Sequence, residues 1–152
     1  MAASNGTVTS VDDIDEPDRG YDTDLFRAGL AARREVLGSE HVDAARERAG
    51  DFSEEWQDFL TLHAWGAAWT RPGLDRRTRS AITLALLAAL HNDGEIPMHV
   101  RAAIRNGLTP VEIREIFLHT AVYAGIPVAN HAIALADATL RDLGLATGDA
   151  TP

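Results

Sequence analysis

The chain has 152 residues and a net charge of −9, and all 14 of its basic residues are arginines because it contains no lysine. It also contains no cysteine, which excludes disulfides, Cys-x-x-Cys redox pairs and thiolate nucleophiles. Without lysine, the chain cannot form a Schiff base with a carbonyl substrate or with pyridoxal phosphate. Thiol peroxidase chemistry and lysine-dependent decarboxylation are therefore excluded.

The negative charge is concentrated at the N-terminus. Residues 1–24 hold seven acidic residues and one arginine, so they carry −6 of the total of −9. The remainder has no surplus of basic residues, and we therefore expect no nucleic-acid partner. No apolar run approaches the roughly 20 residues that cross a bilayer, and no secretion signal is recognisable. We expect a cytoplasmic protein with a disordered acidic leader (1–20), one domain (21–144) and a flexible tail (145–152).

Helix signals follow one another through the first half of the chain. The first helix is expected over residues 24–37, before Gly38, and the second over residues 39–49 with Ser39 as its N-cap. A third is expected after an N-cap at Ser53 and carries the tryptophans. Together these signals predict three helices before residue 70.

The second half predicts four more helices. Asp75 is expected to open a helix in which residues 81–90 are apolar on all sides, a pattern typical of a buried helix. The others are expected over residues 95–106, 110–124 and 127–143. Because no segment alternates between apolar and polar residues, the predicted fold class is all-α, with about six or seven helices.

The segment 65–80, WGAAWTRPGLDRRTRS, contains two of the three tryptophans and four arginines. Indoles and guanidinium groups at this density suggest a flat-walled pocket for an anion. Together with EIPMHVRAA (95–103) and YAGIPVAN (123–130), the segment resembles the carboxymuconolactone decarboxylase family. The resemblance extends from about Tyr21 to about Leu143.

The resemblance implies an alkylhydroperoxidase-like helical fold and a homo-oligomer, a trimer or a hexamer. It further implies decarboxylation of the dicarboxylate 4-carboxymuconolactone to 3-oxoadipate enol-lactone and carbon dioxide, without a cofactor, in protocatechuate catabolism by the β-ketoadipate pathway. The alternatives are a related lactone isomerase or hydrolase and a non-catalytic, ligand-binding oligomer of the same fold.

Glu95 and His99 are the candidate catalytic residues. They are four positions apart, so their side chains share one helix face, where the carboxylate can orient the imidazole and raise its pKa. The spacing alone also fits an ordinary surface pair, and Glu115 and His119 have the same spacing. The family resemblance favours the catalytic interpretation of Glu95 and His99.

Arg71 and Arg79 are the candidate ligands for substrate carboxylates. Arg71 lies on a Pro-Gly turn, whereas Arg79 precedes the apolar run and needs a partner for its charge. The alternative is an ion pair with Asp58, Asp75 or Glu95. Arg76 and Arg77 are expected to be solvated.

Trp65 and Tyr123 are the remaining candidates for contact with the substrate. Trp65 could equally belong to the core, and Tyr123 could merely anchor a helix end. A metal site is not expected, because no three or four histidines or carboxylates converge in the sequence beyond the two Glu/His pairs.

Overall fold

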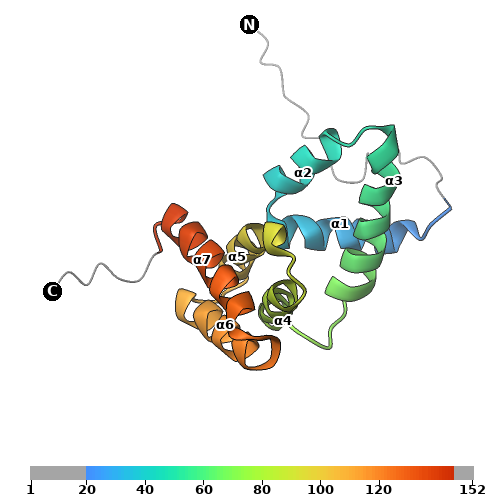
Figure 1. Ribbon diagram of the computed structural model, residues 1–152. Helices are drawn as coiled ribbons and strands as arrows, with labels where there is room; N and C mark the ends of the chain where they lie inside the picture. The colour runs from blue at the N-terminus through green and yellow to red at the C-terminus, as the bar shows by residue number, and fades with distance from the viewer. Residues whose placement is uncertain (1–19, 146–152) are drawn as a thin grey trace, which may run out of the picture.

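The computed structural model describes residues 20–145, and all of the secondary structure in this range is helical (Figure 1). This confirms the all-α prediction. Most of the predicted leader and tail, residues 1–19 and 146–152, lies outside the described residues. The elements are α1 (Thr23–Leu37), α2 (Ser39–Glu47), α3 (Asp51–Leu60), the π-helix η2 (Thr61–Trp69), α4 (Arg76–Ala89), the short 3₁₀ helix η3 (Asp93–Glu95), α5 (Ile96–Arg105), α6 (Pro110–Ala124) and α7 (Ile126–Asp142).

Local capping signals define several helix boundaries as predicted. The Asp75 carboxylate accepts a hydrogen bond from the Thr78 amide and begins α4. Thr109 and Glu112 form a reciprocal capping box at the start of α6. Gly38 ends α1 with a φ of 93°, a value that favours glycine.

Two predicted N-caps are wrong. Ser39 is already helical, and Gly38 takes the N-cap position of α2 without a side-chain cap. Ser53 lies inside α3, which begins after Gly50. In both cases a glycine, one residue before Ser39 and three before Ser53, supplies the non-helical backbone that an N-cap needs, so the helix begins earlier.

The described helices form two groups with α5 between them (Figure 1). One apolar cluster joins α1, α2 and η2 to one side of α5, through Ala102 and Met98. The other joins α4, α6 and α7 to the side of α5 that carries Val100 and Ala103. Because α5 contributes to both clusters, it fixes the two groups relative to each other.

The helix α4 is less buried than its apolar sequence predicts. Leu84 and Ala88 are fully buried, but Ile82, Leu86 and Leu90 are 44%, 53% and 65% exposed. The reason is that α5, α6 and α7 cover only part of its circumference within one chain. The expectation of burial on all sides is therefore wrong for the single chain.

Two glycines allow a close approach between α1 and η2. A Cβ atom added to Gly29 would lie 2.5 Å from the Thr61 carbonyl oxygen and 2.6 Å from the Gly66 nitrogen. A Cβ atom on Gly66 would lie 2.7 Å from the Leu25 carbonyl oxygen. These contacts are with backbone atoms, which cannot rotate away, so both positions require glycine.

We predict that Gly29→Ala lowers the free energy of unfolding by about 1–3 kcal/mol, the usual cost of overpacking a tight contact. Urea denaturation of the purified protein measures this change. Gly73→Ala is the matched control, because an added Cβ atom there meets nothing within 4 Å. Equal stability of the two variants would contradict this account of the α1–η2 contact.

Candidate active site

Glu95 and His99 lie at the beginning of α5. Glu95 is the last residue of η3 and the N-cap of α5, and Pro97 occupies the first turn, where its missing N–H costs nothing. The Glu95 side chain is exposed, and His99 is half-buried one turn further along the helix. The predicted sharing of one helix face is consistent with this placement.

The environment of His99 keeps its imidazole neutral. Burial lowers the pKa of His99 below its ordinary value, Glu95 acts in the opposite direction, and His41 of α2 adds to the lowering. The expectation of a raised pKa is therefore wrong, because burial outweighs the carboxylate. At neutral pH a neutral imidazole offers one N–H donor and one acceptor nitrogen. This form suits a hydrogen bond to an oxygen that gains negative charge.

Arg71 and Arg79 lie together at the junction of η2 and α4. Nη2 of Arg79 donates to the Arg71 carbonyl oxygen over 2.9 Å, while Nε of Arg79 is buried and has no hydrogen-bond partner among the described residues. Neither arginine forms an ion pair with a carboxylate of the described chain, although both have side chains long enough to do so. The proposed alternative, pairing with Asp58, Asp75 or Glu95, is thus not realised within residues 20–145.

The two arginines between them in the sequence, Arg76 and Arg77, do form ion pairs with protein carboxylates. Arg76 pairs with Glu35 of α1, and Arg77 pairs with Glu112 of α6. Both arginines are exposed, as predicted, and each also connects α4 to another helix through its ion pair. Arg71 and Arg79 are left as the guanidinium groups of this segment that can accept an external carboxylate.

Arg79 and His99 lie on neighbouring helices that run in opposite directions. The Asn106 amide nitrogen, at the end of α5, donates to Ser80 Oγ at the start of α4 over 2.9 Å. His99 precedes Asn106 by seven residues, which is about two turns and about 10 Å along the same side of the helix. Because Arg79 is next to Ser80, Arg79 and His99 are offset by about two helix turns along these neighbouring helices.

Trp65 and Tyr123 have different surroundings. Trp65 is 6% exposed, stacks on Trp69 with ring centroids 4.9 Å apart and packs in the same cluster as Ala102. Since Ala102 is one turn beyond His99, Trp65 is a core residue that supports this side of α5. Tyr123 is 80% exposed at the end of α6 and lies against His119.

Tyr123 is distant from Arg79 within one chain. The Arg77–Glu112 ion pair places the beginnings of α4 and α6 side by side. Tyr123 lies 11 residues beyond Glu112, or about 16 Å along the helix at 1.5 Å per residue. Arg79 is near the beginning of α4, so the two side chains lie near opposite ends of the helix pair.

Arg33 is a further residue of this region that the sequence did not indicate. It is 5% exposed, and its guanidinium donates to Thr61 Oγ1 at 3.1 Å and to Gln57 Oε1 at 2.9 Å. Arg33 thus holds the beginning of η2, while Arg79 binds the carbonyl just beyond its end. A charged residue in the middle of an apolar helix face could have drawn attention to this position.

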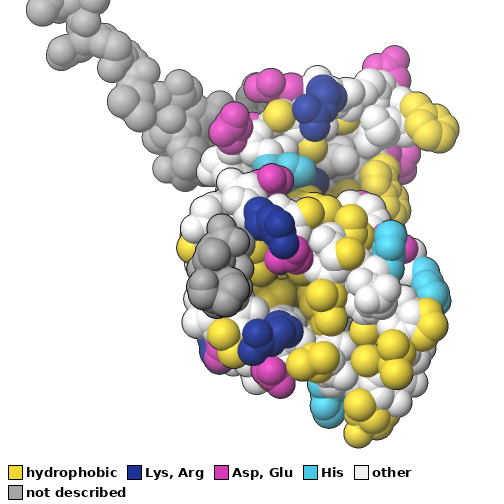
Figure 2. Space-filling view, turned by 60° about the vertical axis from the view of Figure 1, so that its left-hand side comes forward, with side chains coloured by type: hydrophobic (Ala, Val, Ile, Leu, Met, Phe, Trp, Pro, Cys, Tyr) yellow, Lys and Arg dark blue, Asp and Glu magenta, His cyan; other side chains and the backbone are white. Residues whose placement is uncertain are grey.

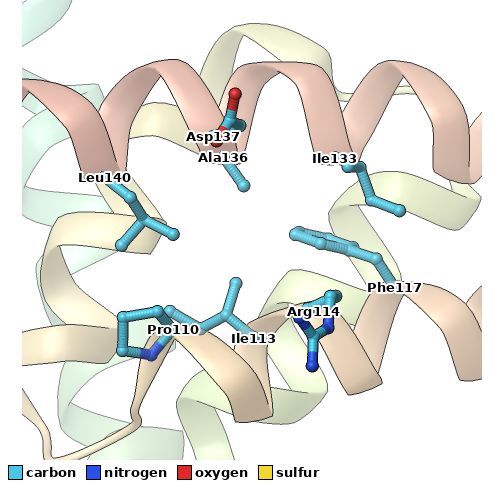
Figure 3. A pocket seen from close by; sticks show the side chains of 8 residues that line it. All are labelled: Pro110, Ile113, Arg114, Phe117, Ile133, Ala136, Asp137 and Leu140. Atoms are coloured by element: carbon cyan, nitrogen blue, oxygen red, sulfur yellow. The ribbon is translucent and has the colours of Figure 1, made fainter. Parts of the chain in front are cut away.

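The cavity between α6 and α7 is a poor candidate for chemistry. It encloses about 170 Å³ and is lined mainly by apolar side chains, among them Ile113, Phe117 and Leu140. Figure 3 shows that the charged ends of Arg114 and Asp137 point away from its centre. The described residues also bring no three potential metal ligands together.

Comparison with known proteins gives concordant results. Residues 54–138 match the carboxymuconolactone decarboxylase family. The chain is similar to the 4-carboxymuconolactone decarboxylase of Acinetobacter baylyi, with 44% identity over 125 residues, which are 82% of this chain and 93% of that protein. It is similar to the nitrosuccinic acid decarboxylase npaB of Metarhizium robertsii, with 44% identity over 119 residues, which are 78% of this chain and 83% of that protein. A 4-carboxymuconolactone decarboxylase sequence from Pseudomonas putida is 46% identical over 41 residues, 27% of this chain and 85% of that sequence.

The opposing influences on His99 can be separated by substitution. We predict that Glu95→Gln lowers the pKa of His99 further and that His41→Ala raises it, because the first removes a negative charge and the second a competing positive charge. NMR titration of the His99 ring signals measures both shifts. Glu115→Gln changes the other Glu/His pair of the same spacing and is the control. It should leave the pKa of His99 unchanged. An unchanged titration in Glu95→Gln would show that the two side chains do not interact.

Proposed function

Because the chain belongs to the carboxymuconolactone decarboxylase family, we propose that it is a carboxy-lyase that converts 4-carboxymuconolactone into 3-oxoadipate enol-lactone and carbon dioxide. The observation that supports this substrate class most directly concerns Arg71 and Arg79, which form no ion pair with a carboxylate of residues 20–145. Arg79 lies near the beginning of the helix that packs beside the helix of His99. The reaction would need no cofactor and would serve protocatechuate catabolism in the cytoplasm.

The substrate can hold the electrons that decarboxylation releases. When the bond between the ring carbon and its carboxylate breaks, the electron pair moves through the adjacent ring double bond into the lactone carbonyl. The resulting dienolate carries its negative charge on the carbonyl oxygen. A proton added to the ring carbon next to that carbonyl then gives the enol-lactone. The protein therefore has to bind two carboxylates, stabilise an oxyanion and allow one proton to reach carbon.

The candidate residues fit these tasks in the following way. Arg79 and Arg71 bind the substrate carboxylates, and a carboxylate oxygen would satisfy the buried Nε of Arg79. His99, neutral because it is buried, donates its ring N–H to the lactone oxygen, and Glu95 orients the ring. Trp65 supports this surface from the core.

Nitrosuccinic acid is a second candidate substrate. The nitrosuccinic acid decarboxylase of Metarhizium robertsii is as similar to the chain, at 44% identity, as the 4-carboxymuconolactone decarboxylase of Acinetobacter baylyi is. Nitrosuccinic acid also has two carboxylates and a strongly electron-withdrawing group, so one site of this design could act on either compound. Parallel assays with both substrates distinguish the two activities.

We predict that the purified protein, treated with a chelator, releases carbon dioxide from 4-carboxymuconolactone and forms the enol-lactone. His99→Ala should reduce kcat by about 10²- to 10⁴-fold, the usual contribution of a positioned proton-transfer or hydrogen-bonding group. Arg79→Gln should mainly raise KM. The control is His63→Ala, which changes an exposed histidine that contacts Phe59.

Three results of this assay would contradict the proposal. Product without carbon dioxide would indicate an isomerase or a hydrolase. Tight binding without turnover would indicate a ligand-binding protein. Full activity of His99→Ala would remove the imidazole from the mechanism.

We also propose that the protein is a homo-oligomer, a trimer or a hexamer, assembled through an apolar face of α4, α6 and α7. Hydrophobic side chains are exposed over the lower part of the molecule in Figure 2. The face consists of Ile82, Leu86, Leu90, Leu118, Val122, Tyr123 and Ile126, which are between 44% and 80% exposed. Monomeric proteins seldom expose so many large apolar side chains together. A second copy on this face would also bring Tyr123 toward a neighbouring chain.

We predict that Val122→Glu, which places a charge in this face, lowers the oligomeric state. Val122 is 78% exposed, so the free energy of unfolding of the single chain should change little. Sedimentation velocity measures the assembly, and circular dichroism confirms the fold. Phe52→Glu, at a fully exposed apolar residue of α3 outside the face, is the control. An unchanged sedimentation coefficient in Val122→Glu would place the interface elsewhere.

A further inference from the structure

A second candidate site lies on a different side of α5, in a groove between α2 and α5. The groove has a volume of about 670 Å³. Its polar lining includes Glu40, His41, Arg48, Arg101 and Arg105. Three of the 14 arginines of an acidic chain therefore face one cavity.

The positive charge of this groove is only partly neutralised by the protein. Arg101 pairs with Asp142 at 3.3 Å, an exposed contact of small value. Nη1 of Arg105 donates to the Val36 carbonyl oxygen over 2.8 Å, which fixes the guanidinium but supplies no negative charge. Arg48 has no ion pair with the described residues. Glu40 is the one acidic side chain among the described residues that line the groove.

The beginning of α2 adds hydrogen-bond donors to the same groove. Gly38, the N-cap of this nine-residue helix, and Ser39 both line it, and no side chain caps the helix. The first amides of a helix have no intrahelical acceptor and carry a partial positive charge. A Cβ atom on Gly38 would lie 3.2 Å from Nη2 of Arg105, so the guanidinium packs beside these amides. Guanidinium groups and free helix amides together form a favourable environment for an anion.

The groove adjoins the Glu95–His99 surface, because His41 lines the groove and also lowers the pKa of His99. Arg101 and Arg105 follow His99 by two and six residues, which corresponds to rotations of about 200° and 240° around the helix axis. Their side chains therefore leave α5 on the side opposite to the imidazole. The arginines of the groove and the imidazole therefore occupy different sides of one helix.

We propose that this groove binds a small dianion whose charges lie on oxygen atoms. A dicarboxylate and a phosphate share this chemistry, and two or three guanidinium groups beside free amides match either. Arg48 and Arg101 supply the charge that attracts the ligand, Arg105 is held in place by the Val36 carbonyl, and the amides at the start of α2 complete the site.

The test is an NMR titration of the ¹⁵N-labelled full chain in low-salt buffer with succinate, inorganic phosphate and, as a monoanion, acetate. We expect saturable shifts of the Ser39 and Glu40 amides with succinate, phosphate or both, and at least tenfold weaker binding of acetate. The double variant Arg48→Gln/Arg101→Gln should weaken dianion binding at least tenfold. The control Arg114→Gln/Arg141→Gln removes the same charge from exposed arginines that pair with Glu115 and Asp137.

The outcomes are distinguishable. Binding of succinate alone identifies a dicarboxylate site, and binding of phosphate alone identifies a phosphate site. Retention of the shifts in Arg71→Gln/Arg79→Gln separates this groove from the proposed substrate site, whatever the activity assays show. The proposal is overturned if neither dianion produces saturable shifts of these amides, or if both double variants lose affinity equally.

Discussion

The close packing of α1 against the π-helix η2 is the constraint on which the candidate site depends. Gly29 and Gly66 let the two backbones approach so closely that a single methyl group would collide with main-chain atoms. This approach brings Arg33 within 3.1 Å of Thr61 at the beginning of η2. It also places Trp65 in the core and directs the chain to Arg71, whose carbonyl oxygen binds Arg79. The positions of both candidate carboxylate ligands therefore follow from a contact between glycines.

The helix α5 distributes its residues among four environments. Val100 and Ala103 face the cluster with α4, α6 and α7, and Ala102 faces the cluster with α1 and η2. His99 lies on one side of the helix, between these two apolar faces. The other side carries Arg101 and Arg105. The ten-residue helix α5 thus carries two surfaces of different chemistry, one with a half-buried imidazole and one with a cationic groove.

Local signals in the sequence predicted the parts of the fold that depend on neighbouring residues. The capping box at Thr109 and the cap at Asp75 operate within one turn, so their helix boundaries could be recognised without tertiary information. Contacts distant in sequence could not be predicted in this way. The π-helix, the Arg33–Thr61 contact and the exposure of Leu86 all depend on which helices pack together.

The candidate site shows the same division between local and distant causes. The influence of Glu95 on His99 follows from their spacing of four residues at the start of a helix. The direction of the His99 pKa shift does not, because burial and His41 of another helix decide it. Likewise, the sequence predicted that Arg76 is solvated, but its ion pair with Glu35 of α1 joins residues far apart in the sequence and could not be predicted.

The charge distribution explains how an acidic protein can attract anionic ligands. Six of the nine net negative charges belong to residues 1–24, and salt screens such charges beyond about 8 Å at physiological ionic strength. A guanidinium about 4 Å from a carboxylate gains about 4 kcal/mol at an effective dielectric constant near 20, before the cost of desolvation. Local arginines therefore outweigh the net charge. For Arg79, whose buried Nε has no partner among the described residues, part of the desolvation cost has already been incurred on folding. A carboxylate that fills this position recovers a hydrogen bond that the free protein lacks, which makes binding at Arg79 more favourable than at a fully solvated arginine.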